Sequence, residues 1–118
     1  MSPNRKLIEA YFATTDRSRL APLLTEDVEW VEWANDVPPS GVVHRGPKEY
    51  IENSGSDELH PHITRWVEEG DTVVAEGTVR VNSKDGKVFH VRFVDIFELD
   101  GGKIRRKSSY GALLKDSA

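Results

Sequence analysis

A single carboxylate interrupts the apolar face of the longest strand that the sequence predicts. Segment 88–99 alternates with the period of two residues that is typical of a β-strand. Asp95 falls on the face whose other members are Phe89, Val91, Phe93, Phe97 and Leu99. Removing an ionised carboxylate from water is costly unless it gains a partner. The pattern therefore predicts that Asp95 is hydrogen-bonded, is protonated or lines a cavity.

The composition is that of a globular chain, since 37% of the 118 residues are hydrophobic and 31% are charged. This length is sufficient for a buried core, so we expect one domain over residues 1–118. The apolar runs are far shorter than the roughly 20 residues that cross a bilayer, and no signal-peptide core follows the N-terminus. We therefore expect a cytoplasmic protein without a membrane partner.

Cysteine content and charge exclude several kinds of site. The chain has no cysteine, which excludes disulfides, thiolate metal sites and cysteine nucleophiles. The net charge of -4 argues against nucleic acid as a partner. We interpret the basic run at 103–107 as a solvated strand or as a partner of acidic segments. His60 and His62 provide too few ligands for a metal, so no metal site is expected.

Hydrophobic spacing, capping residues and turn signals predict mainly helices first and strands later. Ser2 suits the N-cap of a helix over 3–14, and Asp16 that of a shorter helix over 17–24, which Pro22 should distort. A further helix is predicted over 47–53. Strands are predicted at 28–33, 42–44, 63–68, 72–82, 88–99 and 103–110. Short loops join the last four strands, which indicates an antiparallel sheet and the α+β class.

Three segments carry a resemblance that covers nearly the whole chain. They are LLTEDVEW at 23–30, VHRGP at 43–47 and FVDIFELDGGKI at 93–104. Together they resemble the nuclear-transport-factor-2-like superfamily, in its SnoaL-like and ketosteroid-isomerase-like branch. The resemblance implies a cone-shaped, curved antiparallel sheet wrapped around the N-terminal helices, the cystatin-like α+β barrel. It also implies an apolar pocket inside the cone, and a homodimer.

The resemblance implies a catalytic set of Tyr11, Glu32 and Asp95. Ketosteroid isomerases stabilise an oxyanion with a tyrosine of the first helix and a neutral aspartate of a late strand, which match Tyr11 and Asp95. Their proton-transferring base is an aspartate at the end of the first strand, where this chain has Glu32. The added methylene can displace the carboxylate by about 1 Å, which matters for catalysis. Ser54 stands near the position of an accessory tyrosine.

Other reactions of the superfamily match less well or stay open. The acid that a limonene epoxide hydrolase needs on the last strand would fall on Ser109, and its Arg-x-Asp is absent from 78–82. A cyclase of the SnoaL type requires chiefly one carboxylate in the pocket, so this activity stays open. The residues expected to contact the ligand are Trp30, Phe93 and Phe97.

Each catalytic candidate also has a purely structural interpretation. Asp95 can be buried in a pair with Arg105 or Arg106 of the neighbouring strand. Tyr11 can belong to the core, and Glu32 to a solvated acidic run.

Two hypotheses therefore remain open for the function. The first is an isomerase or cyclase that uses acid–base chemistry without a cofactor on a small apolar or polycyclic carbonyl compound. In it Glu32 would transfer the proton, while Tyr11 and Asp95 stabilise the oxyanion. The second is a ligand-binding or scaffold domain of the same fold without catalysis.

The outer face of segment 88–99 would provide the dimer contact through His90, Arg92, Val94 and Ile96.

Overall fold

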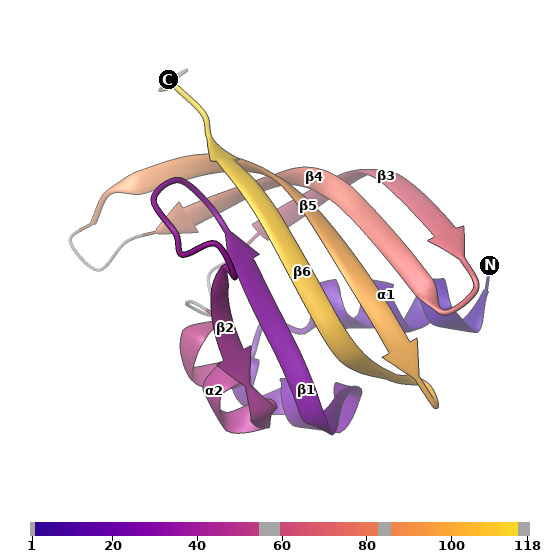
Figure 1. Cartoon of the computed structure of the whole chain (residues 1–118). Coiled ribbons are helices and arrows are strands. Elements are labelled where there is room, and N and C mark those ends of the chain that lie inside the picture. Colours follow the sequence, from indigo (N-terminus) through magenta and orange to yellow (C-terminus); the bar gives the residue numbers. More distant parts are fainter. Residues whose placement is uncertain (1, 55–59, 83–85, 116–118) are drawn as a thin grey trace.

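The computed structural model describes residues 2–54, 60–82 and 86–115, and it places three helical segments against one curved sheet (Figure 1). The helical segments are α1 (Pro3–Ala13), the 3-10 helix η1 (Arg17–Leu23) and α2 (Gly46–Asn53). The strands are β1 (Leu24–Trp33), β2 (Val42–Arg45), β3 (His60–Glu69), β4 (Thr72–Asn82), β5 (Val88–Asp100) and β6 (Lys103–Leu113). The predicted order of elements is confirmed, and most boundaries agree within three residues.

Local sequence explains the helix ends. The Ser2 hydroxyl accepts a hydrogen bond from the Arg5 amide at 3.0 Å, so Ser2 is the N-cap that the sequence predicts for α1. Asp16 caps the second segment through the Ser18 amide. That segment is a 3-10 helix and not an α-helix, and it contains Pro22, the residue that the sequence predicts to distort it.

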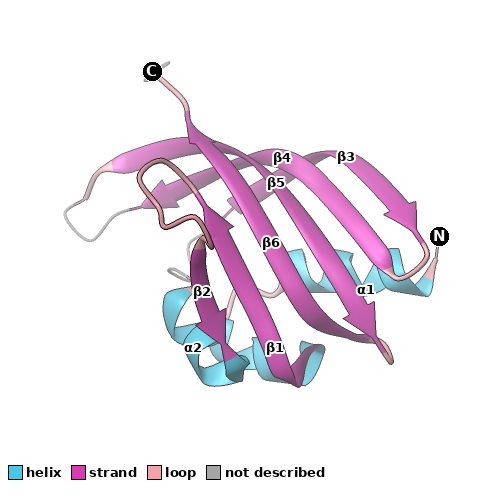
Figure 2. Ribbon diagram, in the orientation of Figure 1, coloured by secondary structure: helices cyan, strands magenta, loops and turns pink. Residues whose placement is uncertain are grey.

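The sheet is mixed, which corrects the expectation of an antiparallel sheet throughout. Its strand order is β2-β1-β6-β5-β4-β3, and β1 runs parallel to β6 while the other neighbouring pairs are antiparallel. The turns that fixed the antiparallel prediction join consecutive strands, whereas β1 and β6 come from opposite ends of the chain. The sheet curves without closing, so β2 and β3 form its two edges (Figure 2).

The core lies between the concave face of the sheet and the helices. Its fully buried side chains include Ile8 of α1, Leu20 of η1 and Tyr50 of α2. They pack against Phe97 and other apolar residues of the sheet. Residue burial along β5 alternates from Phe93 to Leu99, as the sequence predicts, and Asp95 is buried with its apolar neighbours. Within the described residues, no helix is long and apolar enough to cross a membrane.

A bulge in β6 decides which of its residues face the core. Leu99 pairs with Ile104 and Glu98 pairs with Arg106, so Arg105 is an additional residue in the ladder. Beyond this point the alternation changes by one residue, because side chains alternate strictly along a strand. Lys107 is therefore buried opposite Phe97, and Ser109 lies opposite Asp95.

Gly77 allows β3 and β4 to approach each other closely. A Cβ atom at this position would lie 2.0 Å from the His62 carbonyl oxygen, which belongs to the backbone and cannot rotate away. We expect Gly77→Ala to lower the free energy of unfolding by about 1–3 kcal/mol, the usual cost of overpacking. Urea unfolding followed by tryptophan fluorescence measures this change.

Gly111→Ala is the matched control, because its nearest neighbour is the Val91 side chain at 3.3 Å. Equal stability of Gly77→Ala and the wild type would contradict the close approach of the two strands.

Candidate active site

A cavity of about 450 Å³ opens between the concave face of the sheet and the helices. Tyr11, Glu32 and Asp95, which are the three catalytic candidates, all line it, as do Trp30 and Phe93. Phe97 is fully buried and is not among the lining residues. It packs beneath the lining, with its ring 5.3 Å from that of Tyr11.

Asp95 lies at the inner wall of this cavity and is only 5% exposed. Its carboxylate accepts a hydrogen bond from Ser109, the residue opposite it on β6. The Ser109 hydroxyl in turn accepts a hydrogen bond from the Trp30 indole nitrogen at 3.0 Å. Burial raises the pKa of the Asp95 carboxyl, although Lys107 and Ser109 act in the opposite direction.

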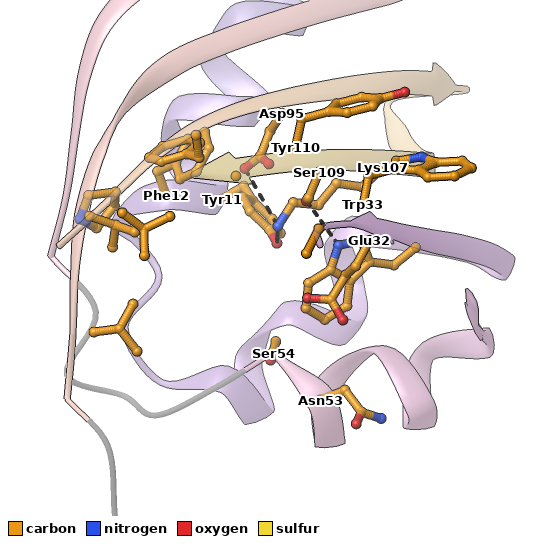
Figure 3. A pocket seen from close by; sticks show the side chains of 18 of the residues that line it. Tyr11, Phe12, Glu32, Trp33, Asn53, Ser54, Asp95, Lys107, Ser109 and Tyr110 are labelled. Atoms are coloured by element: carbon orange, nitrogen blue, oxygen red, sulfur yellow. Dashed lines mark hydrogen bonds and ion pairs between the residues drawn. The ribbon is translucent and has the colours of Figure 1, made fainter. Parts of the chain in front are cut away.

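Lys107, not Arg105 or Arg106, is the basic partner of Asp95. Its Nζ lies 3.7 Å from Asp95 Oδ2, and the residue is 8% exposed (Figure 3). The two arginines form ion pairs with Glu98 instead, at 3.5 and 3.6 Å. The interpretation of the basic run as a partner of acidic segments agrees with these pairs, whereas a fully solvated strand is excluded because Lys107 faces the core.

The Lys107 ammonium is stabilised by several groups at once. It donates a hydrogen bond to the Tyr11 hydroxyl at 3.0 Å and lies 4.8 Å from the centre of the Trp30 ring. Burial opposes the charge on this lysine, but Asp95 and Tyr11 outweigh it and raise the pKa of Lys107. The side chain is therefore a cation at neutral pH.

The hydroxyl of Tyr11, which lines the cavity, contacts that of Tyr50. The Tyr11 and Tyr50 oxygens lie 2.5 Å apart, and Tyr50 of α2 is completely buried. Burial, followed by the neighbouring Tyr11, raises the pKa of the Tyr50 hydroxyl well above its ordinary value of 10.0. The Lys107 ammonium can only donate, so the Tyr11 oxygen accepts a hydrogen bond from it. A second hydrogen bond joins the hydroxyls of Tyr11 and Tyr50, and either of them can be its donor.

Glu32 approaches the cavity from β1 and is hydrogen-bonded to His44 of β2. The distance between Glu32 Oε2 and His44 Nε2 is 2.7 Å. The Glu32 side chain is 41% exposed, whereas that of His44 is 11% exposed and packs against the Trp30 ring. Glu32 therefore combines access to the cavity with a fixed hydrogen-bond partner.

Sequence analysis did not identify Lys107, Tyr50 or His44 as members of the site. His44 lies on the inner face because β1 pairs Trp30 with His44, a register that the sequence does not reveal. For Tyr50 the apolar face of α2 indicated burial only. For Lys107 no signal existed without knowledge of the β6 bulge. Ser54, which stands where an accessory tyrosine was expected, does line the cavity.

The expectation about metal ligands concerned His60 and His62. No group of at least three His, Cys, Asp or Glu side chains is placed to hold an ion in the part of the chain that the structure describes. The His62 side chain is exposed, and that of His60 lies outside the described part.

The fold combines an open, curved sheet with helices on its concave face. The cavity between them is lined by aromatic, acidic and basic side chains. These two features define a class of small proteins with an internal pocket. Residues 5–107 match the SnoaL-like domain, and the chain belongs to this family. Comparison with curated protein sequences gave no match.

Solved structures of the same fold include proteins with different descriptions. TerC, co-crystallised with polyporic acid, has a TM-score of 0.72 at 24% identity, over 92% of this chain and 90% of that one. SalBIII, an epoxide hydrolase/cyclase-like enzyme of pyran ring formation in salinomycin, has a TM-score of 0.77 at 17% identity, over 92% and 90%. A proposed ketosteroid isomerase from Kribbella flavida has a TM-score of 0.72 at 18% identity, over 98% and 82%.

The raised pKa of Tyr50 predicts an alkaline loss of stability. The unfolded chain releases this proton near pH 10, while the folded protein retains it, so the free energy of unfolding should fall above about pH 10 and be unaffected below it. Tyr50→Phe should make this decline shallower by about 1.4 kcal/mol per pH unit. Urea unfolding between about pH 8 and about pH 11, a range that brackets the titration of an unfolded tyrosine, measures the slope.

Tyr110→Phe, at an exposed tyrosine, is the reference for loss of a surface hydroxyl. A slope in Tyr50→Phe as steep as in the wild type would contradict the assignment.

Proposed function

We propose that the protein is an enzyme that performs acid–base chemistry without a cofactor on a small apolar carbonyl compound. The observation that carries this proposal is that Glu32 and the cluster of Tyr11, Asp95 and Lys107 line the same cavity. A base and an oxyanion-stabilising group must both reach one substrate, and a scaffold domain has no need to combine them.

Glu32 is the proposed proton-transferring base. Its carboxylate is accessible from the cavity and held by His44, so it can remove a proton from the carbon next to the carbonyl group. The electron pair of that C–H bond then forms the enolate, and the negative charge moves to the carbonyl oxygen. Return of the proton from Glu32 to another carbon gives an isomer. Alternatively, the enolate carbon attacks a second carbonyl of the same molecule, the π electron pair of that carbonyl moves to its oxygen, and this oxygen takes the proton from Glu32, which closes a ring.

Tyr11 is the proposed donor to the enolate oxygen, and Asp95 acts on it indirectly. In the sequence-based hypothesis Asp95 was a neutral donor beside Tyr11. The contact of Asp95 with Lys107 supports a different role, in which the carboxylate holds the ammonium against the Tyr11 oxygen. A cation there stabilises negative charge that develops on the ligand next to Tyr11.

The comparisons support both reaction types equally. One protein of this fold is a proposed ketosteroid isomerase. Another is described as an epoxide hydrolase/cyclase-like enzyme. TerC, with polyporic acid in its crystals, supports a small organic ligand for such a cavity. Trp30 and Phe93 give the cavity flat aromatic walls that suit a ring system.

Conversion of a β,γ-unsaturated ketosteroid into its conjugated enone, followed by ultraviolet absorbance, tests the proposal. We expect Glu32→Gln to lower kcat by about 10²- to 10⁴-fold, the usual contribution of a general base. Glu29→Gln is the matched control, since Glu29 lies on the same strand and pairs with Arg45 outside the cavity.

Equal turnover by the wild type and Glu32→Gln would reject Glu32 as the base. No turnover by folded wild-type protein would reject steroid isomerisation. It would then favour a cyclase with another substrate, or the alternative of a ligand-binding domain.

We also propose that two copies associate through the convex face of the sheet. Val94 and Ile96 of β5 and Val74 of β4 are only partly buried there, beside the ion pair of Arg92 with Glu76. Apolar residues among charged pairs are typical of a subunit contact.

Sedimentation equilibrium at micromolar concentration should give twice the chain mass of 13.3 kDa. Ile96→Glu should shift the protein to the monomer, because the contact would bury an unpaired charge. A wild-type monomer would contradict the dimer.

A further inference from the structure

The Lys107 ammonium is the most unusual group in the cavity. It lies among four aromatic rings, with ring centres at 4.8 Å for Trp30, 5.2 Å for Tyr11, 5.8 Å for Phe97 and 5.9 Å for Tyr50. An apolar side chain of similar length would fill this space without the cost of removing a charge from water. The position of this charge therefore calls for a role beyond packing.

Asp95 does not saturate the ammonium. Their 3.7 Å separation is long for a charge-assisted hydrogen bond, which is usually about 2.7–2.9 Å. Ser109 accepts from Trp30, so its single proton is directed to Asp95, which holds the carboxylate against β6. The carboxylate is thus shared between two partners.

The ammonium retains capacity to donate. It has three N–H bonds, and the structure gives it two polar partners among the described residues, Tyr11 and Asp95. At least one N–H bond is left over for a further acceptor. Lys107 is also one of the residues that line the cavity, so a bound molecule can provide that acceptor.

The lining also includes a second cation and two carboxylates. Arg17 of η1 lines the cavity as a second cation. Both carboxylates have partners, since Glu32 is hydrogen-bonded to His44 and Asp95 contacts Lys107 and Ser109. The apolar wall formed by Val79, Val91 and Phe93 suits the body of the ligand.

We propose that Lys107 binds an anionic oxygen of the ligand directly, so that the cavity selects apolar ring compounds that carry a carboxylate or an acidic enol over their neutral analogues. The inference rests on the same cavity as the proposed function and deepens it by naming the ligand class. It requires no turnover, because the ammonium would hold the anion in the ground state.

Isothermal titration with 2-naphthoate and 2-naphthamide tests this selection, because the two compounds differ chiefly in the charge of one group. The wild type should bind 2-naphthoate about tenfold to a hundredfold more tightly, as expected for one hydrogen bond between charged groups. Lys107→Met, which keeps the chain length and removes the charge, should bind the two compounds within about twofold of each other. Lys103→Met, at an exposed lysine of the same strand, should keep the wild-type preference.

If Lys107→Met fails to fold, the affinities of the wild type for 2-naphthoate and 2-naphthamide still test the inference. Equal affinity of the wild type for the two compounds, or no binding of either, would overturn the inference. A preference that persists in folded Lys107→Met would overturn it as well. Selective binding of 2-naphthoate without turnover of any ketone would support this inference and contradict the proposed function. Turnover of a ketone without a preference for 2-naphthoate would support the proposed function and contradict this inference.

Discussion

The contact between Lys107 and Asp95 joins the two central strands of the sheet and determines the chemistry of the cavity. Each group is nearly excluded from water, and each would be costly to bury alone. Together they bring one positive and one negative charge to the place where α1 and α2 meet the sheet. The Tyr11 hydroxyl, which accepts from Lys107 and lies beside Tyr50, connects this pair to the helices. Glu32, Tyr11 and the aromatic walls of the cavity are arranged around this contact.

The bulge at Arg105 places Lys107 on the inner face of β6, where it can contact Asp95. Without the additional residue, the inner face of β6 would carry Arg106 and Ser108, and Lys107 would point to the convex side. One inserted residue thus exchanges an outer for an inner position along the rest of the strand. It also leaves Arg105 and Arg106 beside Glu98 at the surface. The distribution of positive charge between surface and cavity follows from this local irregularity.

Local patterns predicted the elements well and the assembly in part. The alternation of β5 placed Asp95 correctly on a buried face, and the caps at Ser2 and Asp16 predicted where the helical segments begin. The parallel pairing of β1 with β6 was not predictable from turns, because no short loop joins these strands. Lys107 was missed for a related reason, since a bulge depends on how two strands pair and not on the residues of one strand. The resemblance to a family indicated Tyr11, Glu32 and Asp95 as candidates, but their partners His44, Tyr50 and Lys107 became visible only in three dimensions.

The position of β6 in the sheet has a consequence for how the chain is made. β6 follows β1 to β5 in the chain and is synthesised after them, yet it lies between β1 and β5 and connects the β1–β2 edge to the β3–β5 meander. Until it leaves the ribosome, the N-terminal segments and the meander have no sheet contact with each other. The ordering of Tyr11, Trp30 and Asp95 into one site is therefore a late, long-range event, and folding of this kind is slow relative to folding through local contacts. Before β6 pairs with both parts, β1 and β5 each have an unpaired edge, and chaperones bind exposed edges and apolar surface of this kind.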